Sequence, residues 1–269
     1  MDFHILNNDN LKIRFAVGGS KGEIVLLIHG LGGSIESWVN NIDTLSKEFK
    51  VIALDLPGFG LSDKPIIDYT IPFYTNCITK FLRILIRTRH VSIVGASLGG
   101  QIAAEITLRH PELVSKLVLI SPAGALPKSF KGTPSLYKYV SILRADSVLE
   151  TKKALSAVDR HNKVIDDKHV EISYHRLSLP GAKHAFASAL RGSSKAARLD
   201  KRLDRIKAKM LLIWGKDDQI IPVKFTEPFV NLRNCRIILI ENSGHQLYFT
   251  HHVLFNKYVS DFIKESTAI

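Results

Sequence analysis

Cysteine is scarce in this sequence. Only two cysteines occur in 269 residues, Cys77 and Cys235, and they lie far apart along the chain. Neither has a partner at metal-binding spacing, so the pattern predicts neither a disulfide framework nor a zinc site. His-Glu-x-x-His, paired Cys-x-x-Cys and phosphate-binding P-loop motifs are also missing. We therefore expect no metal and no nucleotide cofactor, and a reducing, cytoplasmic location.

Long apolar runs are missing too. No stretch reaches the ~18 uninterrupted apolar residues of a membrane-spanning helix. The first ten residues, MDFHILNNDN, lack the basic start and apolar run of a signal peptide. These absences predict a protein with no stable membrane insertion. The hydrophobic content of 45% nevertheless suffices for one sizeable core, and the length suits one α/β domain with an insertion.

Positive charge is abundant but unevenly distributed. The net charge is +12, and residues 127–207 alone hold 18 lysines and arginines against 8 aspartates and glutamates. A nucleic-acid-binding protein would show a recognised module or aromatic residues among the basic ones, and neither is found. We predict no nucleic-acid partner and interpret the charge as the solvated surface of an insertion. Attraction of anionic substrates or membrane surfaces is the alternative.

Short apolar runs alternate with amphipathic stretches, which is typical of βα units around a parallel sheet. Strands are expected at residues 11–17, 24–28, 51–54, 91–94, 117–120, 210–214 and 236–240, and helices at 34–49, 71–87, 98–110 and 252–264. The sequence therefore predicts an α/β fold with a mostly parallel sheet flanked by helices.

One region breaks this alternation. Residues 126–205 contain no apolar strand run, and ~80 residues are too many for one structureless loop in a compact domain. Helices are expected there at 137–148, 153–161 and 182–190. We interpret the region as a helical lid inserted into a core that consists of residues 1–125 and 206–269.

The segment VSIVGASLGG, residues 91–100, carries the clearest chemical signal. It reads as an apolar strand, a Gly-x-Ser-x-Gly turn and the start of a helix. A sharp turn of this kind holds its serine in a strained conformation, and the glycines let neighbouring chain approach. The helix start supplies a backbone N–H and a positive dipole end, both suited to a developing oxyanion. Ser97 is therefore the candidate nucleophile.

Four segments together resemble the α/β-hydrolase superfamily, in its esterase, lipase and carbon–carbon-bond hydrolase branch. They are HGLGGS at 29–34, DLPGFGLS at 55–62, the serine turn, and a late Asp and His pair. The resemblance runs from about residue 24 to the C-terminus and is weakest in the lid. It implies a Ser-Asp-His catalytic triad in that chain order.

The resemblance assigns the remaining site residues. Its Gly-x-x-Asp-x-x-x-Pro pattern selects Asp218 as the acid, with Asp217 as the alternative, and its Gly-His loop selects His245 as the base. It implies an oxyanion hole formed by the backbone N–H groups of Leu31 and Leu98. His29 is expected to hold the loop through hydrogen bonds, and 55–62 to shape the pocket wall.

The expected function is ester hydrolysis through an acyl-enzyme by a carboxylesterase that acts on a small-molecule ester, as a monomer or homodimer. Two alternatives remain open. One is a hydrolase of dienoates from ring cleavage, a branch that often holds the substrate carboxylate with a lid arginine. Arg191 is the candidate for that role, and Arg176 or Arg198 would serve as well. The other is a non-catalytic small-molecule receptor on the same scaffold.

Overall fold

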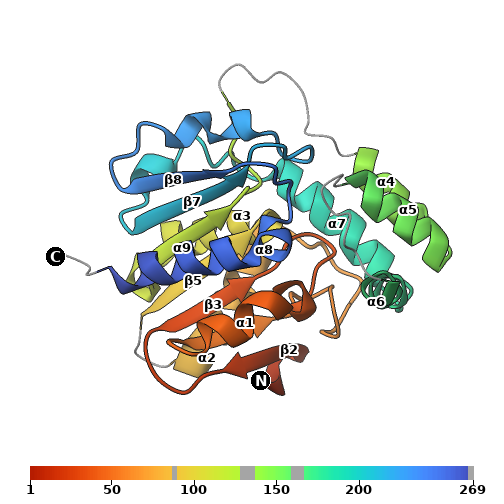
Figure 1. Cartoon of the computed structure of the whole chain (residues 1–269). Helices are drawn as coiled ribbons and strands as arrows, with labels where there is room; N and C mark the ends of the chain where they lie inside the picture. The colour runs from red at the N-terminus through yellow and green to blue at the C-terminus, as the bar shows by residue number, and fades with distance from the viewer. Residues whose placement is uncertain (87–89, 128–136, 159–166, 266–269) are drawn as a thin grey trace.

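A computed structural model describes residues 1–86, 90–127, 137–158 and 167–265, and shows a twisted sheet with helices on both faces (Figure 1). Eight described strands form the sheet in the order β1-β2-β4-β3-β5-β6-β7-β8. The strands are β1 (Asp2–Asn8), β2 (Leu11–Gly18), β3 (Ile24–Ile28), β4 (Lys50–Leu54), β5 (Val91–Ala96), β6 (Val114–Ile120), β7 (Lys209–Gly215) and β8 (Cys235–Ile240). From β4 to β8 all neighbours are parallel, whereas β2 is antiparallel to both β1 and β4.

The α-helices connect the strands and extend beyond them. They are α1 (Val39–Leu45), α2 (Ile71–Ile86), α3 (Leu98–Arg109), α4 (Tyr137–Arg144), α5 (Val148–Val158), α6 (Asp167–Leu177), α7 (Ala182–Lys195), α8 (Leu247–Thr250) and α9 (His252–Lys264). Short 3₁₀ helices occur at η1 (Ile35–Trp38), η2 (Pro111–Leu113), η3 (Leu203–Arg205) and η4 (Val223–Phe229). No helix in the described ranges is both long and apolar enough to cross a membrane.

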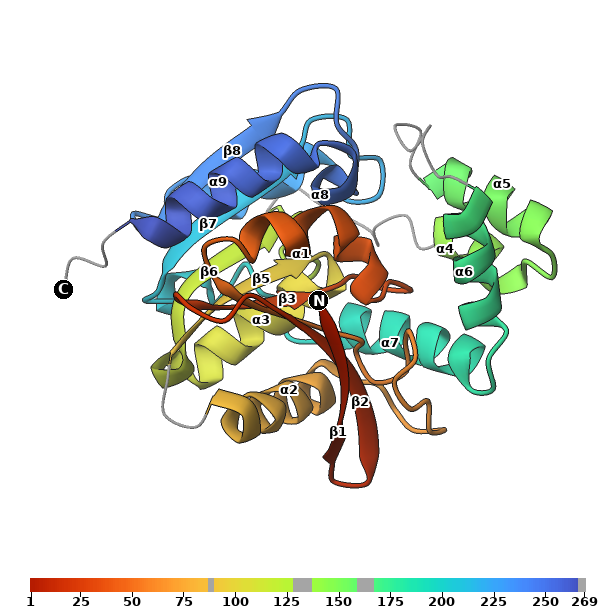
Figure 2. The same ribbon diagram turned by 60° about the horizontal axis from the view of Figure 1, so that its bottom comes forward.

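The central strands are apolar throughout because both of their faces are covered. Every residue of β3 is buried, and its side chains alternate between two cores. Leu26 packs with α2 and α3 on one face, whereas Val25 and Leu27 pack with α1 and α9 on the other. Figure 2 shows these two helix layers on opposite sides of the sheet. The predicted mostly parallel α/β sheet is thus confirmed.

The seven expected strands are all present, within three residues at each end. β1 was not expected because six of its seven residues are at least partly exposed and its sequence, DFHILNN, is largely polar. The expected helix at 34–49 is divided into η1 and α1. Arg87, the last residue of another expected helix, lies outside the described residues.

The helices α4–α7 follow β6 and precede β7, and they gather at one side of the sheet (Figures 1 and 2). Three of them, α4, α5 and α7, overlap the helices expected in the lid, although all three have different bounds and His161 lies outside the described residues. The helix α6 was not expected. Its sequence, DKHVEISYHRL, is mostly polar, and only Val170 is fully buried, so its apolar periodicity is weak.

Candidate active site

Ser97 occupies a sharp turn between β5 and α3. Its backbone φ of 53° and ψ of −114° lie where residues other than glycine are strained. Surrounding hydrogen bonds hold this conformation: the Ser97 N–H donates to the Ile120 carbonyl at 2.9 Å, and the Gln101 and Ala123 N–H groups donate to the Ser97 carbonyl. The turn places the serine at the carboxyl end of the sheet, where its side chain borders a pocket.

Glycine is required on either side of this serine. A Cβ at Gly95 would lie 2.4 Å from the carbonyl oxygen of Gly99. A Cβ at Gly99 would lie 2.3 Å from the carbonyl oxygen of Ile28 and 2.5 Å from that of His29. The Ile28 and His29 carbonyl groups that Gly99 approaches belong to the backbone at the end of β3, in the middle of the sheet. The two glycines therefore allow α3 to begin directly against the central strands.

Gly99→Ala is accordingly expected to lower the melting temperature by about 2–5 °C, because overpacking against fixed backbone costs on the order of 1–3 kcal/mol. Gly30→Ala is the matched control. Its Cβ would meet only side-chain and carbonyl atoms at 3.2 Å or beyond, the nearest being Ser97 Cβ. Thermal unfolding followed by circular dichroism measures both variants. Equal melting temperatures for Gly99→Ala and wild type would contradict this packing argument.

Asp218 and His245 form a hydrogen-bonded pair. The loop after β7 carries Asp218 and the loop after β8 carries His245, and His245 Nδ1 lies 2.7 Å from Asp218 Oδ2. The other carboxylate oxygen accepts the backbone N–H groups of Ile220 and Ile221, both at 2.9 Å. Asp217 is exposed, whereas the Asp218 side chain is fully buried. The structure therefore brings His245 to Asp218, the residue favoured over Asp217.

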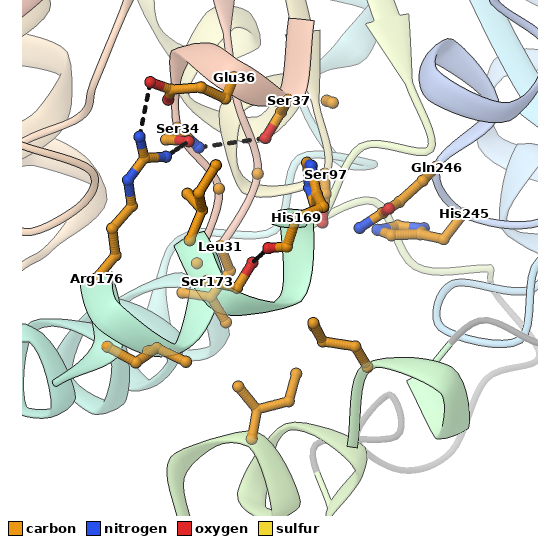
Figure 3. A pocket seen from close by; sticks show the side chains of 18 of the residues that line it. Leu31, Ser34, Glu36, Ser37, Ser97, His169, Ser173, Arg176, His245 and Gln246 are labelled. Carbon is orange, nitrogen blue, oxygen red and sulfur yellow. Dashed lines mark hydrogen bonds and ion pairs between the residues drawn. The ribbon is translucent and has the colours of Figure 1, made fainter. Parts of the chain in front are cut away.

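This contact determines which nitrogen of His245 carries the proton. An ionised carboxylate only accepts hydrogen bonds, so Nδ1 must hold the hydrogen and Nε2 is left with a lone pair. Ser97 and His245 border the same pocket, shown in Figure 3. A serine, a histidine with a basic Nε2 and a buried aspartate behind it are the components of acyl-transfer catalysis.

The loop after β3 passes directly beside the serine, since a Cβ at Gly30 would lie 3.2 Å from Ser97 Cβ. Leu31 borders the pocket, and Leu98 is the first residue of α3. Within the described residues, neither the Leu31 N–H nor the Leu98 N–H donates to a protein acceptor. Both groups are thus available to an oxygen atom of a substrate.

His29 lies beneath this loop and is fully buried. Its Nε2 accepts the Leu56 N–H at 3.0 Å, and its Nδ1 lies 2.7 Å from the Gly30 carbonyl oxygen. Nε2 acts as an acceptor, so Nδ1 carries the hydrogen and donates it to Gly30. Burial lowers the pKa of His29, which keeps the ring neutral. These contacts hold the 29–33 loop in place and leave no ring nitrogen for a substrate.

A row of alternating charges runs from the core to α6. Buried Asp55 accepts a hydrogen bond from Arg14 Nη1 at 3.1 Å, and Arg14 Nη2 lies 3.0 Å from Glu36 Oε1. The same Glu36 oxygen lies 2.6 Å from Arg176 Nη2. Arg176 also donates from Nη1 to Ser34 Oγ. Asp55 therefore does more than shape a turn, because it anchors a chain of ion pairs that reaches the pocket.

The pocket is a cavity of about 100 Å³ between the strand ends and α4–α7. Its apolar lining from the helices consists of Ile142, Leu155, Ile172, Leu177 and Phe186. Arg176 lines it as well, but Arg191 does not: the Arg191 side chain is exposed on α7. Arg198 is also absent from the described lining and pairs with Asp200 instead. Only one of the three arginines considered from the sequence thus reaches the pocket.

The fold, the serine turn and the loop order all agree with one family. A family model described as the alpha/beta hydrolase fold matches residues 23–252. The chain belongs to the α/β hydrolase fold family. No group of three or more His, Cys, Asp or Glu side chains suited to a metal ion is found in the described parts of this hydrolase.

Several relatives of this α/β hydrolase are named enzymes. It is 28% identical over 233 residues to a 2-hydroxy-6-oxo-6-(2'-aminophenyl)hexa-2,4-dienoic acid hydrolase of Metapseudomonas resinovorans, with 84% of this chain and 78% of that protein covered. It is 29% identical over 234 residues to the dihydrolipoyllysine-residue acetyltransferase component of an acetoin cleaving system of Cupriavidus necator. That match covers 81% of this chain, which spans 58% of the relative's length.

A solved structure gives the same fold. The crystal structure of a membrane phospholipase A, described as a bacterial virulence factor, superposes with a TM-score of 0.84 at 26% sequence identity. The superposition covers 98% of this hydrolase and 87% of that chain. The dienoic acid hydrolase and the phospholipase A, both similar to this chain, are named for different substrates.

Proposed function

We propose that this α/β hydrolase is a carboxylesterase in which Ser97, His245 and Asp218 form a catalytic triad. The observation that carries the proposal is the 2.7 Å contact between His245 Nδ1 and the buried Asp218 carboxylate, in a pocket that Ser97 also borders. The contact leaves His245 Nε2 with a lone pair, so that it can act as the base for Ser97, which borders the same pocket. No cofactor enters the reaction.

In the first half-reaction His245 Nε2 removes the Ser97 hydroxyl proton while Ser97 Oγ attacks the ester carbonyl carbon. The oxygen that gains negative charge accepts hydrogen bonds from the Leu31 and Leu98 N–H groups, each worth about 2.7–4 kcal/mol in the transition state. The carbon–oxygen bond to the alcohol then breaks, and His245 returns the proton to the departing alkoxide. An acyl-Ser97 ester remains.

In the second half-reaction water takes the place of the alcohol. His245 removes a water proton, the resulting hydroxide attacks the acyl carbon, and the bond to Ser97 Oγ breaks as the serine recovers its proton. Asp218 stays ionised and stabilises the protonated imidazole in both halves. The products are one carboxylic acid and one alcohol, and the enzyme returns to its starting state.

The pocket favours a neutral ester over a dienoate. A dienoate substrate carries a carboxylate, which needs an available cation. Arg176 is the single lysine or arginine among the described pocket-lining residues, and Glu36 already binds it. The apolar faces of α4–α7 suit an acyl chain, and the cavity of about 100 Å³ suits a short one. Because helices from this segment line the pocket that Ser97 borders, we propose that residues 126–205 form a lid over Ser97.

A substrate panel tests this assignment. Purified protein is assayed with p-nitrophenyl acetate, butyrate, octanoate and palmitate, and in parallel with dienoates from ring cleavage. We expect turnover of the esters, highest for the short chains and lowest for palmitate, with feeble cleavage of dienoates. Fast dienoate cleavage with slow ester turnover would instead assign this enzyme to the chemistry of its Metapseudomonas relative. Tight binding of a small molecule with turnover of neither class would favour a receptor.

A further inference from the structure

Arg176 takes no part in the proposed reaction, although it lines the same pocket as Ser97. Figure 3 shows it reaching from α6 toward Ser34 and Glu36. An arginine beside a nucleophile would ordinarily bind a substrate carboxylate through paired hydrogen bonds. Here one of its terminal nitrogens binds Glu36 at 2.6 Å and the other donates to Ser34 Oγ. The two terminal nitrogens of Arg176 that a substrate carboxylate would bind are therefore already bonded to Glu36 and Ser34.

Glu36 is held firmly by the core. It lies in η1, directly after the 29–33 loop, and its Oε1 also contacts Arg14. Arg14 in turn contacts Asp55, whose Oδ1 and Oδ2 accept the backbone N–H groups of Ile35 and Leu61 at 2.7 and 2.8 Å. Two acids and two guanidinium groups alternate in this row, so their charges cancel. A substrate therefore meets a neutralised arginine rather than a free cation.

We propose that Glu36 is a specificity-determining residue that excludes esters with a carboxylate in the acyl chain, by occupying Arg176. A substrate carboxylate that replaced Glu36 would leave this partly buried acid with Arg14 alone. Separating such a charge pair is costly, because both groups are shielded from water: the Arg176 and Glu36 side chains are only 16% and 26% exposed. A neutral acyl chain binds without separating Glu36 from Arg176. The inference rests on the proposed esterase function.

The discrimination should not depend on pH in the working range. Burial opposes ionisation of Glu36, but hydrogen bonds from Arg176 and Arg14 outweigh it and lower the pKa of Glu36 to about 2. For an acid with a lowered pKa the ion pair is intact above the ordinary value of 4.5 and is lost only as the pH falls toward 2. Among the described residues, Arg14, Asp55, His29 and Lys64 interact electrostatically with members of this row, and His169 and His245 line the same pocket.

The experiment compares matched anionic and neutral esters. The anionic set comprises the monoethyl esters of glutaric, adipic, pimelic and suberic acids, and the neutral set the ethyl esters of pentanoic, hexanoic, heptanoic and octanoic acids. Hydrolysis is followed by titration of the acid released. Wild type should favour the neutral member of every pair. Glu36→Gln should raise the anionic-to-neutral ratio of kcat/KM by roughly tenfold or more, most strongly at the chain length that reaches Arg176.

Two further variants isolate the cause. The double variant with Glu36→Gln and Arg176→Gln should lose the gain, because no guanidinium remains to bind the substrate carboxylate. Glu171→Gln is the matched control, since Glu171 is exposed on the same helix α6 and does not line the pocket. It removes one negative charge from the lid and should leave the ratio unchanged. An equal rise in Glu171→Gln would show a general charge effect and overturn the proposal.

The Glu36→Gln variant and two fallback measurements can each contradict the proposal. No rise in the ratio for a folded Glu36→Gln enzyme would overturn the proposal. If that variant fails to fold, Glu36→Asp takes its place. Its carboxylate still pairs with Arg14 but is too short to hold Arg176 fully, so the anionic-to-neutral ratio should rise by a smaller factor. No rise in that ratio would again contradict the proposal. If wild type hydrolyses no ester, the esterase function fails on its own. Calorimetric binding of monoethyl adipate to Ser97→Ala, with and without Glu36→Gln, then tests the same exclusion without turnover.

Discussion

Ser97→Ala is expected to lower kcat for p-nitrophenyl butyrate by about 10⁴-fold or more, because alanine has no hydroxyl with which to form the acyl-enzyme. Residual turnover from the Leu31 and Leu98 N–H groups and from substrate binding should remain about 10³- to 10⁴-fold above the uncatalysed rate. Steady-state kinetics measure the loss. A fluorophosphonate probe offers a second readout: it should label wild type at the peptide that contains Ser97 and leave the variant unlabelled.

The matched control for this change is Ser178→Ala. Ser178 is exposed just beyond the end of α6 and its hydroxyl bonds only the Tyr174 carbonyl, so wild-type turnover is expected. Circular dichroism of both variants shows whether the fold is kept. Ester turnover by Ser97→Ala equal to that of wild type would rule out the serine mechanism.

Asp218→Asn is expected to lower kcat by about 10³- to 10⁴-fold, and the hydrogen bonds of Asp218 give the reason. Oδ1 accepts two backbone N–H groups, from Ile220 and Ile221, so the amide oxygen of asparagine must occupy that position. The amide NH₂ then faces His245 Nδ1 and forces the ring proton onto Nε2. A ring with its proton on Nε2 has no lone pair there to accept the Ser97 proton.

Asp217→Asn provides the comparison. The two aspartates are neighbours in one turn, but the Asp217 side chain is exposed and Asp218 is the one that contacts His245. We expect Asp217→Asn to retain activity close to that of wild type. Steady-state kinetics of both variants at neutral pH show which of the two aspartates orients His245. A larger loss in Asp217→Asn than in Asp218→Asn would transfer the orienting role to the neighbouring acid.

Much of the fold could be predicted because the apolar runs of the central strands and the turns that end them are distinct in the sequence. The strands β3, β5 and β7 are short apolar runs whose residues are almost all buried, and each ends in a small or polar turn. Since parallel strands end at the same edge of a sheet, side chains placed just after them converge. The family resemblance selects Asp218 and His245 beside Ser97, and these three residues, which are distant in sequence, each follow a strand of the parallel sheet.

The ion-pair row was not predictable in the same way. Arg176 and Ser34 are separated by 142 positions, and no periodic pattern connects them. Glu36 looks like an ordinary charged residue near a helix start, and α6 has too few apolar residues for a clear helical pattern. Spacing could not choose between Arg191, Arg176 and Arg198, and Arg191, the named candidate, is exposed on α7. Contacts between a lid and a core depend on tertiary packing, which sequence periodicity does not encode.

The place of α4–α7 in the chain has an evolutionary consequence. The strands on either side of them, β6 and β7, are direct parallel neighbours with Leu119 opposite Leu212, so the inserted segment leaves at the carboxyl end of β6 and returns to the amino end of the adjacent strand. Exchanging such a segment for a longer or shorter one changes the cost of closing the loop only slightly and leaves the sheet register untouched. The proposed lid is therefore a segment that recombination can replace, so that the substrate changes while the residues at the strand ends stay the same.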